Sequence, residues 1–223
     1  MFQRESLRPL LTGGLIELDL DVPQSGIERL FDYLELLVHW NVAYNLTAVR
    51  DPVAMVTRHL LDSLAIARFV AGKTLVDLGS GAGLPGIPLA IADPLRRVTL
   101  VDSNGKKARF LREVARRLDL GNATVAECRV ETLEGRFDCV TTRAFAALAD
   151  MLDIGGNLLA PGGVWLAQKG RVPQDELDAV RAPFGVAAVH RLSVPGLDAE
   201  RHVVIIKRTG SVDHCRAGNQ TLS

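Results

Sequence analysis

The chain has few cysteines, few aromatic side chains and no long apolar run. Its three cysteines, Cys128, Cys139 and Cys215, are too few and too scattered for a disulfide framework or a zinc site, and their odd number is typical of a reducing compartment. No apolar run approaches the roughly eighteen residues of a membrane span, and the first residues lack a hydrophobic signal core. We therefore expect a cytoplasmic protein with no structural metal and no membrane anchor.

The chain also lacks net charge, which argues against a purely electrostatic nucleic-acid binder. The distribution is less even than the total. Residues 96–117 carry eight basic and two acidic side chains, whereas residues 1–40 carry three basic and seven acidic ones. The basic run predicts either a solvated helix face or a surface that binds phosphates.

Length and pattern predict one main domain with a helical extension. At 223 residues and 48% hydrophobic composition, the chain can bury one good core. We assign residues 1–72 to an N-terminal helical extension, 73–208 to the main domain and 209–223 to a disordered tail, because the tail is polar and without periodicity.

Two helices are predicted in the extension. The first begins at Ser25, whose hydroxyl and Glu28 form a capping box. The second begins at Asp51, which is followed by proline, and carries His59 and Asp62 on one face. These last two side chains are candidates for catalysis, or they simply bond each other and hold the extension on the main domain.

From residue 74 onward, short β-branched runs alternate with helical patterns. The predicted strands are 74–78, 98–102, 123–128, 137–142, 163–168, 186–193 and 202–208, and the predicted helices lie near 86–92, 105–118, 144–154 and 174–181. Alternation of this kind predicts an α/β fold whose parallel sheet is covered on both faces. The last two strands have no helix between them, so we expect an antiparallel terminal hairpin.

The most informative motif is a strand that runs into four glycines and then into an apolar helix, residues 75–86. Glycines such as Gly79 and Gly81 let backbone approach a ligand closely. The first strand carries Asp77 near its end, and the next strand ends in Asp102, which is placed to hold both hydroxyls of a ribose. The pattern predicts a site for a nucleoside cofactor.

Two cofactor classes satisfy this pattern. The glycine spacing matches the dinucleotide fingerprint of nicotinamide-dependent oxidoreductases. Against it, Asp77 would repel a pyrophosphate, Pro85 and Pro88 remove N–H donors from the helix start, and no second domain follows. S-adenosylmethionine, which has a cationic amino-acid end and no phosphate, fits better. A module that binds S-adenosylmethionine or RNA without turnover is the remaining alternative.

The chain also resembles a known family along residues 25–208. The resemblance rests on Trp40-Asn41, Asn45-Leu46-Thr47, His59-Leu60-Leu61-Asp62-Ser63-Leu64, the stretch from Asp77 to Leu89, Asp102-Ser103 with Lys106, Phe110-Leu111, Arg129-Val130-Glu131, Phe137-Asp138 and Arg143-Ala144. These elements are similar to the bacterial 16S ribosomal RNA guanine-N7 methyltransferases, also called ribosomal RNA small subunit methyltransferase G or glucose-inhibited division protein B. The resemblance implies a class I S-adenosylmethionine-dependent methyltransferase fold: seven strands, mostly parallel, with an antiparallel last hairpin and a small N-terminal helical extension.

The resemblance also implies a site and a reaction. It implies cofactor contacts at Gly79, Leu84, Val130, Glu131 and Arg143, to which the motif analysis adds Asp77, Gly81 and Asp102. Methyl transfer to guanine N7 requires no general base, because N7 has a free lone pair and no proton. We expect a monomer that acts on 16S ribosomal RNA or the small ribosomal subunit, with flanking phosphates bound by Arg50, Arg58, Lys106 and Lys107.

Overall fold

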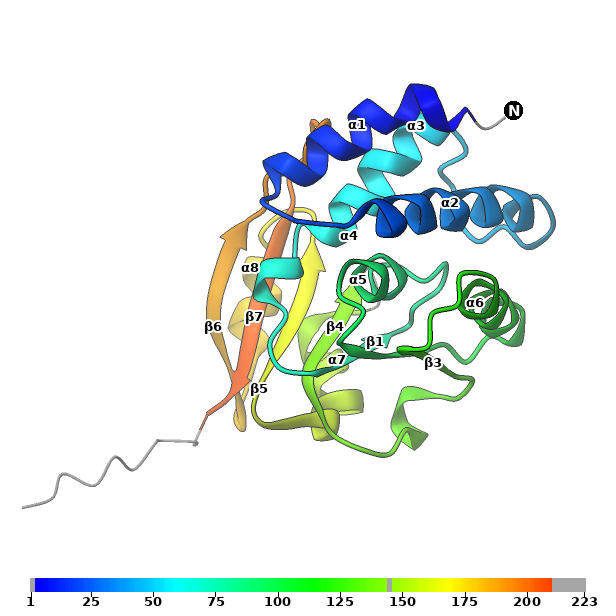
Figure 1. Cartoon of the computed structure of the whole chain (residues 1–223). Helices are drawn as coiled ribbons and strands as arrows, with labels where there is room; N and C mark the ends of the chain where they lie inside the picture. Colours follow the sequence, from blue (N-terminus) through cyan, green and yellow to red (C-terminus); the bar gives the residue numbers. More distant parts are fainter. Residues whose placement is uncertain (1–2, 144–145, 210–223) are drawn as a thin grey trace, which may run out of the picture.

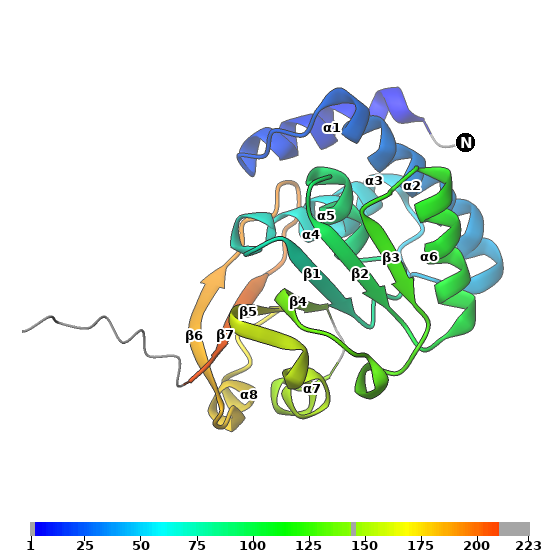
Figure 2. The same cartoon turned by 60° about the horizontal axis from the view of Figure 1, so that its bottom comes forward.

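A computed structural model describes residues 3–143 and 146–209, which form a twisted seven-stranded sheet between helices (Figures 1 and 2). The strands are β1 (Thr74–Leu78), β2 (Arg97–Val101), β3 (Ala123–Ala126), β4 (Phe137–Arg143), β5 (Leu159–Lys169), β6 (Phe184–Arg191) and β7 (His202–Arg208). Their order is β3-β2-β1-β4-β5-β7-β6, and β7 runs antiparallel to both neighbours while the other pairs are parallel. This confirms the predicted fold class. The predicted tail lies outside the described residues beyond Thr209.

Helices cover both faces of the sheet (Figure 2). One face carries α5 (Gly86–Ala92) and α6 (Gly105–Arg117), and the other carries α7 (Leu148–Gly155) and α8 (Gln174–Ala179), with the short turns η3 (Val130–Thr132) and η4 (Gly156–Leu158). These match the predicted helices, except that α7 begins later than expected. Within the described residues, no helix combines the length and the apolar character needed to cross a bilayer.

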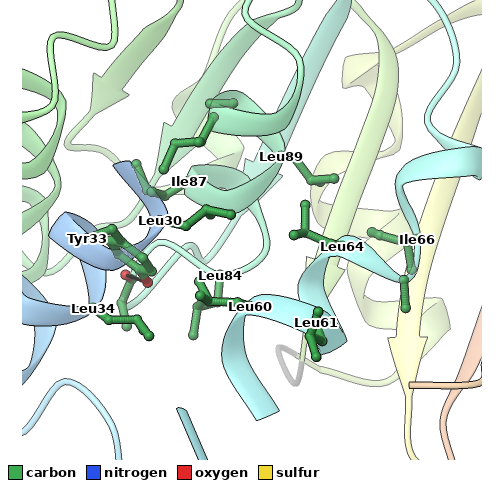
Figure 3. Close-up of a cluster of buried hydrophobic side chains, with 14 of the residues drawn as sticks. Leu30, Tyr33, Leu34, Leu60, Leu61, Leu64, Ile66, Leu84, Ile87 and Leu89 are labelled. Atoms are coloured by element: carbon green, nitrogen blue, oxygen red, sulfur yellow. Dashed lines mark hydrogen bonds between the residues drawn. The ribbon is translucent and has the colours of Figure 1, made fainter. Parts of the chain in front are cut away.

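The N-terminal helices pack on the face that carries α5. They are α1 (Arg4–Glu17), α2 (Gln24–Tyr44) and a continuous run made of α3 (Pro52–Met55), the π-helical turn η1 (Val56–Leu61) and α4 (Asp62–Leu64), followed by η2 (Ala67–Phe69). Figure 3 shows Leu30 and Leu34 of α2 meeting Leu60 and Ile87 in one apolar cluster. Burying each such side chain stabilises the fold by about 1.5–3 kcal/mol, so the extension and the sheet share one core.

Helix α1 was not predicted from the sequence. Pro9 and two glycines interrupt its helical pattern, and each lowers intrinsic helix propensity. Tertiary packing overrides this, because Gly14 lets α1 approach Leu61: a Cβ at Gly14 would lie only 3.1 Å from Leu61 Cγ. Part of the acidic excess of residues 1–40 forms ion pairs between α1 and α2. Arg4 and Arg8 of α1 form ion pairs with three acids of α2, namely Glu28, Asp32 and Glu35.

The predicted capping box at Ser25 is wrong. Helix α2 begins at Gln24, and no side chain of the described residues caps its start. Glu28 instead lies 2.8 Å from the Arg8 guanidinium, because an ion pair with α1 competes with the local bond back to Ser25. The second predicted cap is confirmed: the Asp51 carboxylate accepts a hydrogen bond from the Ala54 N–H at 2.9 Å.

Candidate functional site

The glycine loop between β1 and α5 is stabilised by hydrogen bonds from its own backbone N–H groups. Gly79 and Gly81 have φ values of +69° and +58°, which side chains with a Cβ rarely adopt. The N–H groups of Gly83 and Leu84 both donate to the Ser80 carbonyl, at 2.7 and 3.1 Å. The loop is therefore held by internal hydrogen bonds, and these two amides are not free for a ligand.

Asp102 follows β2 directly and lies beside the glycine loop. Its Oδ2 accepts a hydrogen bond from the Gly81 N–H and its Oδ1 accepts one from the Asn104 N–H, both at 2.9 Å. Lys107 Nζ lies 3.8 Å from the same Oδ2. Each carboxylate oxygen has a second lone pair, so the group is fixed in position and still able to accept hydrogen bonds from a ligand.

A cavity of about 460 Å³ opens at this edge of the sheet, and we call it the glycine-loop cavity. It is lined by Gly79, Val101, Asp102, Ser103, Asn104, Lys107, Cys128, Arg129, Val130, Glu131 and Ile154. The buried apolar side chain of Val130 forms part of its lining, together with the exposed Glu131 and the buried Asp102. Four predicted cofactor residues, Gly79, Asp102, Val130 and Glu131, thus line one cavity.

Three other predicted cofactor residues lie off this lining. Asp77 is fully buried, and its Oδ2 accepts a hydrogen bond from the Gly86 N–H at 3.1 Å, while Oδ1 has no hydrogen-bond partner in the described part of the chain. Burial raises the pKa of Asp77 to about 7. The Gly81 N–H donates to Asp102 Oδ2, and the Leu84 side chain lies in the apolar cluster with α2 (Figure 3). Asp77 and Leu84 thus support the loop from its far side.

Tyr33 of α2 also supports the glycine loop. Its hydroxyl donates a hydrogen bond to the Ala82 carbonyl at 2.7 Å, and the side chain is completely buried. The extension therefore reaches the candidate site directly. Sequence reasoning missed this residue, because a tyrosine that bonds to a backbone atom 49 residues away leaves no local signal.

A second cavity, of about 440 Å³, lies at the carboxyl ends of β4 and β5, and we call it the arginine cleft. Buried Asp62 stands at its centre. Its Oδ2 accepts a hydrogen bond from Arg143 Nη1 at 3.0 Å, its Oδ1 accepts one from Arg201 Nε at 2.9 Å, and its backbone carbonyl accepts one from Gln168 Nε2 at 3.0 Å. Arg143, the eighth predicted cofactor residue, therefore lies in this cleft. The full lining is Val49, Arg58, His59, Asp62, Arg143, Gln168, Lys169, Gly170 and Arg201.

His59 and Asp62 do not bond each other, so that prediction is wrong. The π-helical turn η1 breaks the regular spacing, and His59 Nε2 lies 2.9 Å from Thr47 Oγ1 instead. Asn41 fixes the same threonine by bonding both its N–H and its carbonyl. Burial lowers the pKa of His59 to about 4, so its ring is neutral near pH 7. The Asn-Leu-Thr and His motifs thus hold one loop together.

The four predicted RNA-binding residues lie in three places. Arg50 is exposed and its Nη2 donates to Asn45 Oδ1 at 3.3 Å. Arg58 is exposed at the arginine cleft, Lys106 is exposed at the start of α6, and the half-buried Lys107 beside it lines the glycine-loop cavity. Their role in RNA binding stays a prediction.

Ion pairs reduce the basic excess of residues 96–117. Arg112 lies 2.7 Å from Glu127, and Glu113 is shared by Arg116 and Arg117 at 2.9 and 2.8 Å. Helix α6 is also about 20 Å long and connects two parallel strands, so its first cations lie near the carboxyl ends of the strands and its last cations near the amino ends. The segment therefore does not present one basic surface.

Solved methyltransferases share this fold. A ribosomal protein L11 methylase from Lactobacillus delbrueckii subsp. bulgaricus is similar with a TM-score of 0.53 at 18% identity, over 72% of this chain and 80% of that one. A glycopeptide N-methyltransferase complexed with S-adenosylhomocysteine has a TM-score of 0.57 at 12% identity, over 66% of this chain and 86% of that one. The architecture is that of the class I methyltransferases.

Sequence comparison is more specific. The family model described as rRNA small subunit methyltransferase G matches residues 26–204. A protein of that name from Xanthomonas euvesicatoria is 58% identical over 80% of this chain and 85% of its own length. One from Stenotrophomonas maltophilia is 55% identical over 90% of this chain and 95% of its own length. The chain belongs to the rRNA small subunit methyltransferase G family.

Proposed function

We propose that this protein transfers a methyl group from S-adenosylmethionine to N7 of a guanine in 16S ribosomal RNA. The family relationship supports the reaction class and the ribosomal RNA substrate. The observation that carries the proposal is the glycine loop that adjoins the glycine-loop cavity, with Asp102 fixed beside it. That arrangement suits a ligand that is recognised as a nucleoside.

The residues of the cavity fit S-adenosylmethionine better than a dinucleotide. Asp102 has lone pairs free for the two ribose hydroxyls, and Val130 offers an apolar wall to a purine. A diphosphate needs free backbone N–H groups at the glycine loop. Here the amides of Ser80, Gly81, Gly83 and Leu84 all donate to protein oxygens. We therefore assign the cavity to the sulfonium cofactor rather than to a nicotinamide cofactor.

The protein's chemical task is one of positioning. The bound cofactor supplies an electrophilic methyl group on sulfur, and guanine N7 supplies a lone pair without losing a proton. The protein holds the two in line, which contributes on the order of 7–11 kcal/mol when geometry is pre-organised. Leu78 at the end of β1 pairs with Thr142 of β4, and Gly79 and Arg143 follow them. The glycine-loop cavity and the arginine cleft therefore lie at the same carboxyl edge of the sheet. We place the cofactor in the first and the RNA at the second.

The residues proposed for the two ligands follow from this division. The proposed cofactor contacts are Gly79, Asp102, Val130 and Glu131 on the lining, with Asp77, Gly81, Leu84 and Arg143 around them. Arg50, Arg58 and the lysines that begin α6 are proposed to bind RNA phosphates. No side chain is assigned a proton transfer, and the neutral His59 is assigned a structural role.

Methyl transfer is the direct test. The protein is expected to move labelled methyl from S-adenosylmethionine to 16S RNA in small subunits purified from cells that lack this activity, with the label mapping to one guanine N7. RNA and subunits that already carry the modification serve as the control. Binding of S-adenosylmethionine and RNA without methyl transfer would favour the non-catalytic module. A change in fluorescence that shows bound NADH, together with no methyl transfer, would favour the oxidoreductase.

Two substitutions test the cofactor cavity. Gly81→Val forces a β-branched residue to a φ of +58°, and Glu131→Ala removes a carboxylate from the lining, so each is expected to weaken S-adenosylhomocysteine binding about tenfold or more in calorimetry. Gly121→Val, where an added Cβ meets nothing within 4 Å, and Glu134→Ala, at an exposed site off the lining, are the matched controls. Unchanged affinity in the first pair would remove both residues from the site.

A further inference from the structure

The arginine cleft holds more positive charge than its internal contacts neutralise. Lys169 is paired, because its Nζ lies 2.7 Å from Glu176 Oε2 and also donates to the Ala146 carbonyl at 3.0 Å. Asp62 is the one acid on the lining, and it faces both Arg143 and Arg201. With Arg58 included, the lining holds three guanidinium groups and one carboxylate, which is a formal excess of two positive charges.

The guanidinium groups keep donors free. Arg201 uses Nε on Asp62 and Nη1 on the Glu200 carbonyl, and an arginine has five N–H bonds to donate. The exposed side chain of Arg58 makes no hydrogen bond or ion pair with any residue in the described ranges, although its backbone carbonyl accepts one from Arg143. Asp62 thus orients Arg201 while the Arg58 side chain stays available, and the free donors of both arginines suit an anion.

A second observation concerns a buried polar atom on the lining of the cleft. Gln168 is 5% exposed, and its Oε1 has no hydrogen-bond partner among residues 3–143 and 146–209, whereas its Nε2 donates to the Asp62 carbonyl. A buried acceptor without a partner costs about 1–3 kcal/mol. A ligand that brings both an anion and a hydrogen-bond donor would satisfy this cleft. An RNA strand has both, because its phosphates alternate with ribose 2′-hydroxyls.

We infer that the arginine cleft binds a backbone phosphate of the substrate RNA next to the target nucleotide, through Arg58 and Arg201. This inference rests on the proposed function, and it adds Arg201, which is 139 residues from Asp62 in sequence. Arg143 stands between this phosphate site and the glycine-loop cavity, since it pairs with Gln168 across β4 and β5 and continues β4 beside the end of β1. The phosphate contact fixes the RNA at the edge where the cofactor ends.

The test compares Arg58→Gln and Arg201→Gln with Arg181→Gln. Arg181 is exposed and precedes β6, whose first residue pairs with Arg208 at the opposite edge of the sheet. Binding of unmethylated 16S RNA to the full chain saturated with S-adenosylhomocysteine is measured over a range of salt concentrations. Both cleft variants are expected to bind about tenfold more weakly, with a salt slope shallower by about 0.7 for each lost phosphate contact. The control variant keeps the original slope, and affinity for S-adenosylhomocysteine is unchanged in all three.

Arg58→Gln is the more informative variant, because the Arg58 side chain has no intramolecular partner among the described residues. The substitution is therefore not expected to destabilise the fold. If its salt slope and RNA affinity equal those of the original protein, the phosphate site is wrong. RNA binding is measured without turnover, so the phosphate site and the proposed methyl transfer are tested independently. A protein that transfers methyl normally, with cleft variants that bind normally, overturns the phosphate site alone. Loss of RNA binding in the cleft variants of a protein that transfers no methyl supports the phosphate site and overturns the proposed reaction.

Discussion

Replacing Asp62 by alanine is expected to lower the free energy of unfolding by about 3 kcal/mol. The carboxylate is almost completely buried between Arg143 and Arg201, at 3.0 and 2.9 Å. Burial raises the pKa of Asp62, and the two guanidinium groups oppose that shift by stabilising the charged form. Its removal leaves two cations facing each other without a counter-ion.

The size of this effect follows from burial. Breaking a fully buried pair costs about 3–5 kcal/mol, and we take the lower end because the Arg143 and Arg201 side chains remain 22% and 26% exposed. Urea unfolding at pH 7 measures the loss. Asp153→Ala, at an exposed position, is the matched control and is expected to change stability by less than about 0.5 kcal/mol. A loss below about 1 kcal/mol for Asp62→Ala would show that solvent, not Asp62, balances the arginines.

Asp62→Asn separates charge from shape. The amide keeps one acceptor oxygen but turns an N–H donor toward a guanidinium group, so it is expected to lose most of the same stability. Because Asp62 lies in α4, while Arg143 ends β4 and Arg201 precedes β7, the loss would also loosen the extension from the sheet. Loss of cooperativity in the unfolding curve of either variant would reveal this.

The sheet was predictable because its signals are local. Short β-branched runs, glycines after β1 and an acid after β2 each depend on a few neighbouring residues, and parallel strands bring their carboxyl ends together. Gly79 and Asp102 therefore meet as expected. Helix α1 was missed because its stability comes from contacts with α2 and η1, which outweigh the low helix propensity of Pro9 and its glycines.

The arginine cleft was only partly predictable for a related physical reason. Asp62 was singled out, but its partners are supplied by β4 and by the turn before β7, and no local pattern connects such distant residues. The spacing of His59 and Asp62 suggested a bond that a regular helix would allow. The π-helical turn changes the angle between them, and Thr47 takes the imidazole instead.

Two buried groups are expected to give the protein opposing pH dependences. Burial raises the pKa of Asp77 from 3.8 to about 7 and lowers the pKa of His59 from 6.5 to about 4. The folded state therefore binds more protons at Asp77 than the unfolded state does between about pH 4 and 7, so this stabilisation is lost as pH rises through 7. At His59 the unfolded state binds more protons, so its contribution is lost as pH falls from 6.5 toward 4.

Single variants reveal the two contributions. Between pH 5 and pH 8 the Asp77 contribution falls by about 2–3 kcal/mol, and the His59 contribution rises by about 2 kcal/mol. Relative to the original protein, Asp77→Asn is expected to gain stability as pH rises, because it carries no charge to bury. His59→Gln is expected to gain stability as pH falls, since it cannot be protonated.

The measurement is urea unfolding at several pH values between 5 and 8, with the difference from the original protein taken at each pH. This difference removes the contributions of the other titrating groups, provided that each variant keeps the same m-value. Asparagine can retain the acceptor for the Gly86 N–H, and glutamine can reach Thr47, so neither change need disturb its neighbours. If both difference curves are flat, the protonation of the two side chains does not differ between the folded and unfolded states. Water would then solvate their charged forms well enough to prevent the pKa shifts. If only the Asp77→Asn curve is flat, the hydrogen bonds from Gly86 and Ser80 and the Arg143 charge stabilise the carboxylate at least as strongly as burial opposes it.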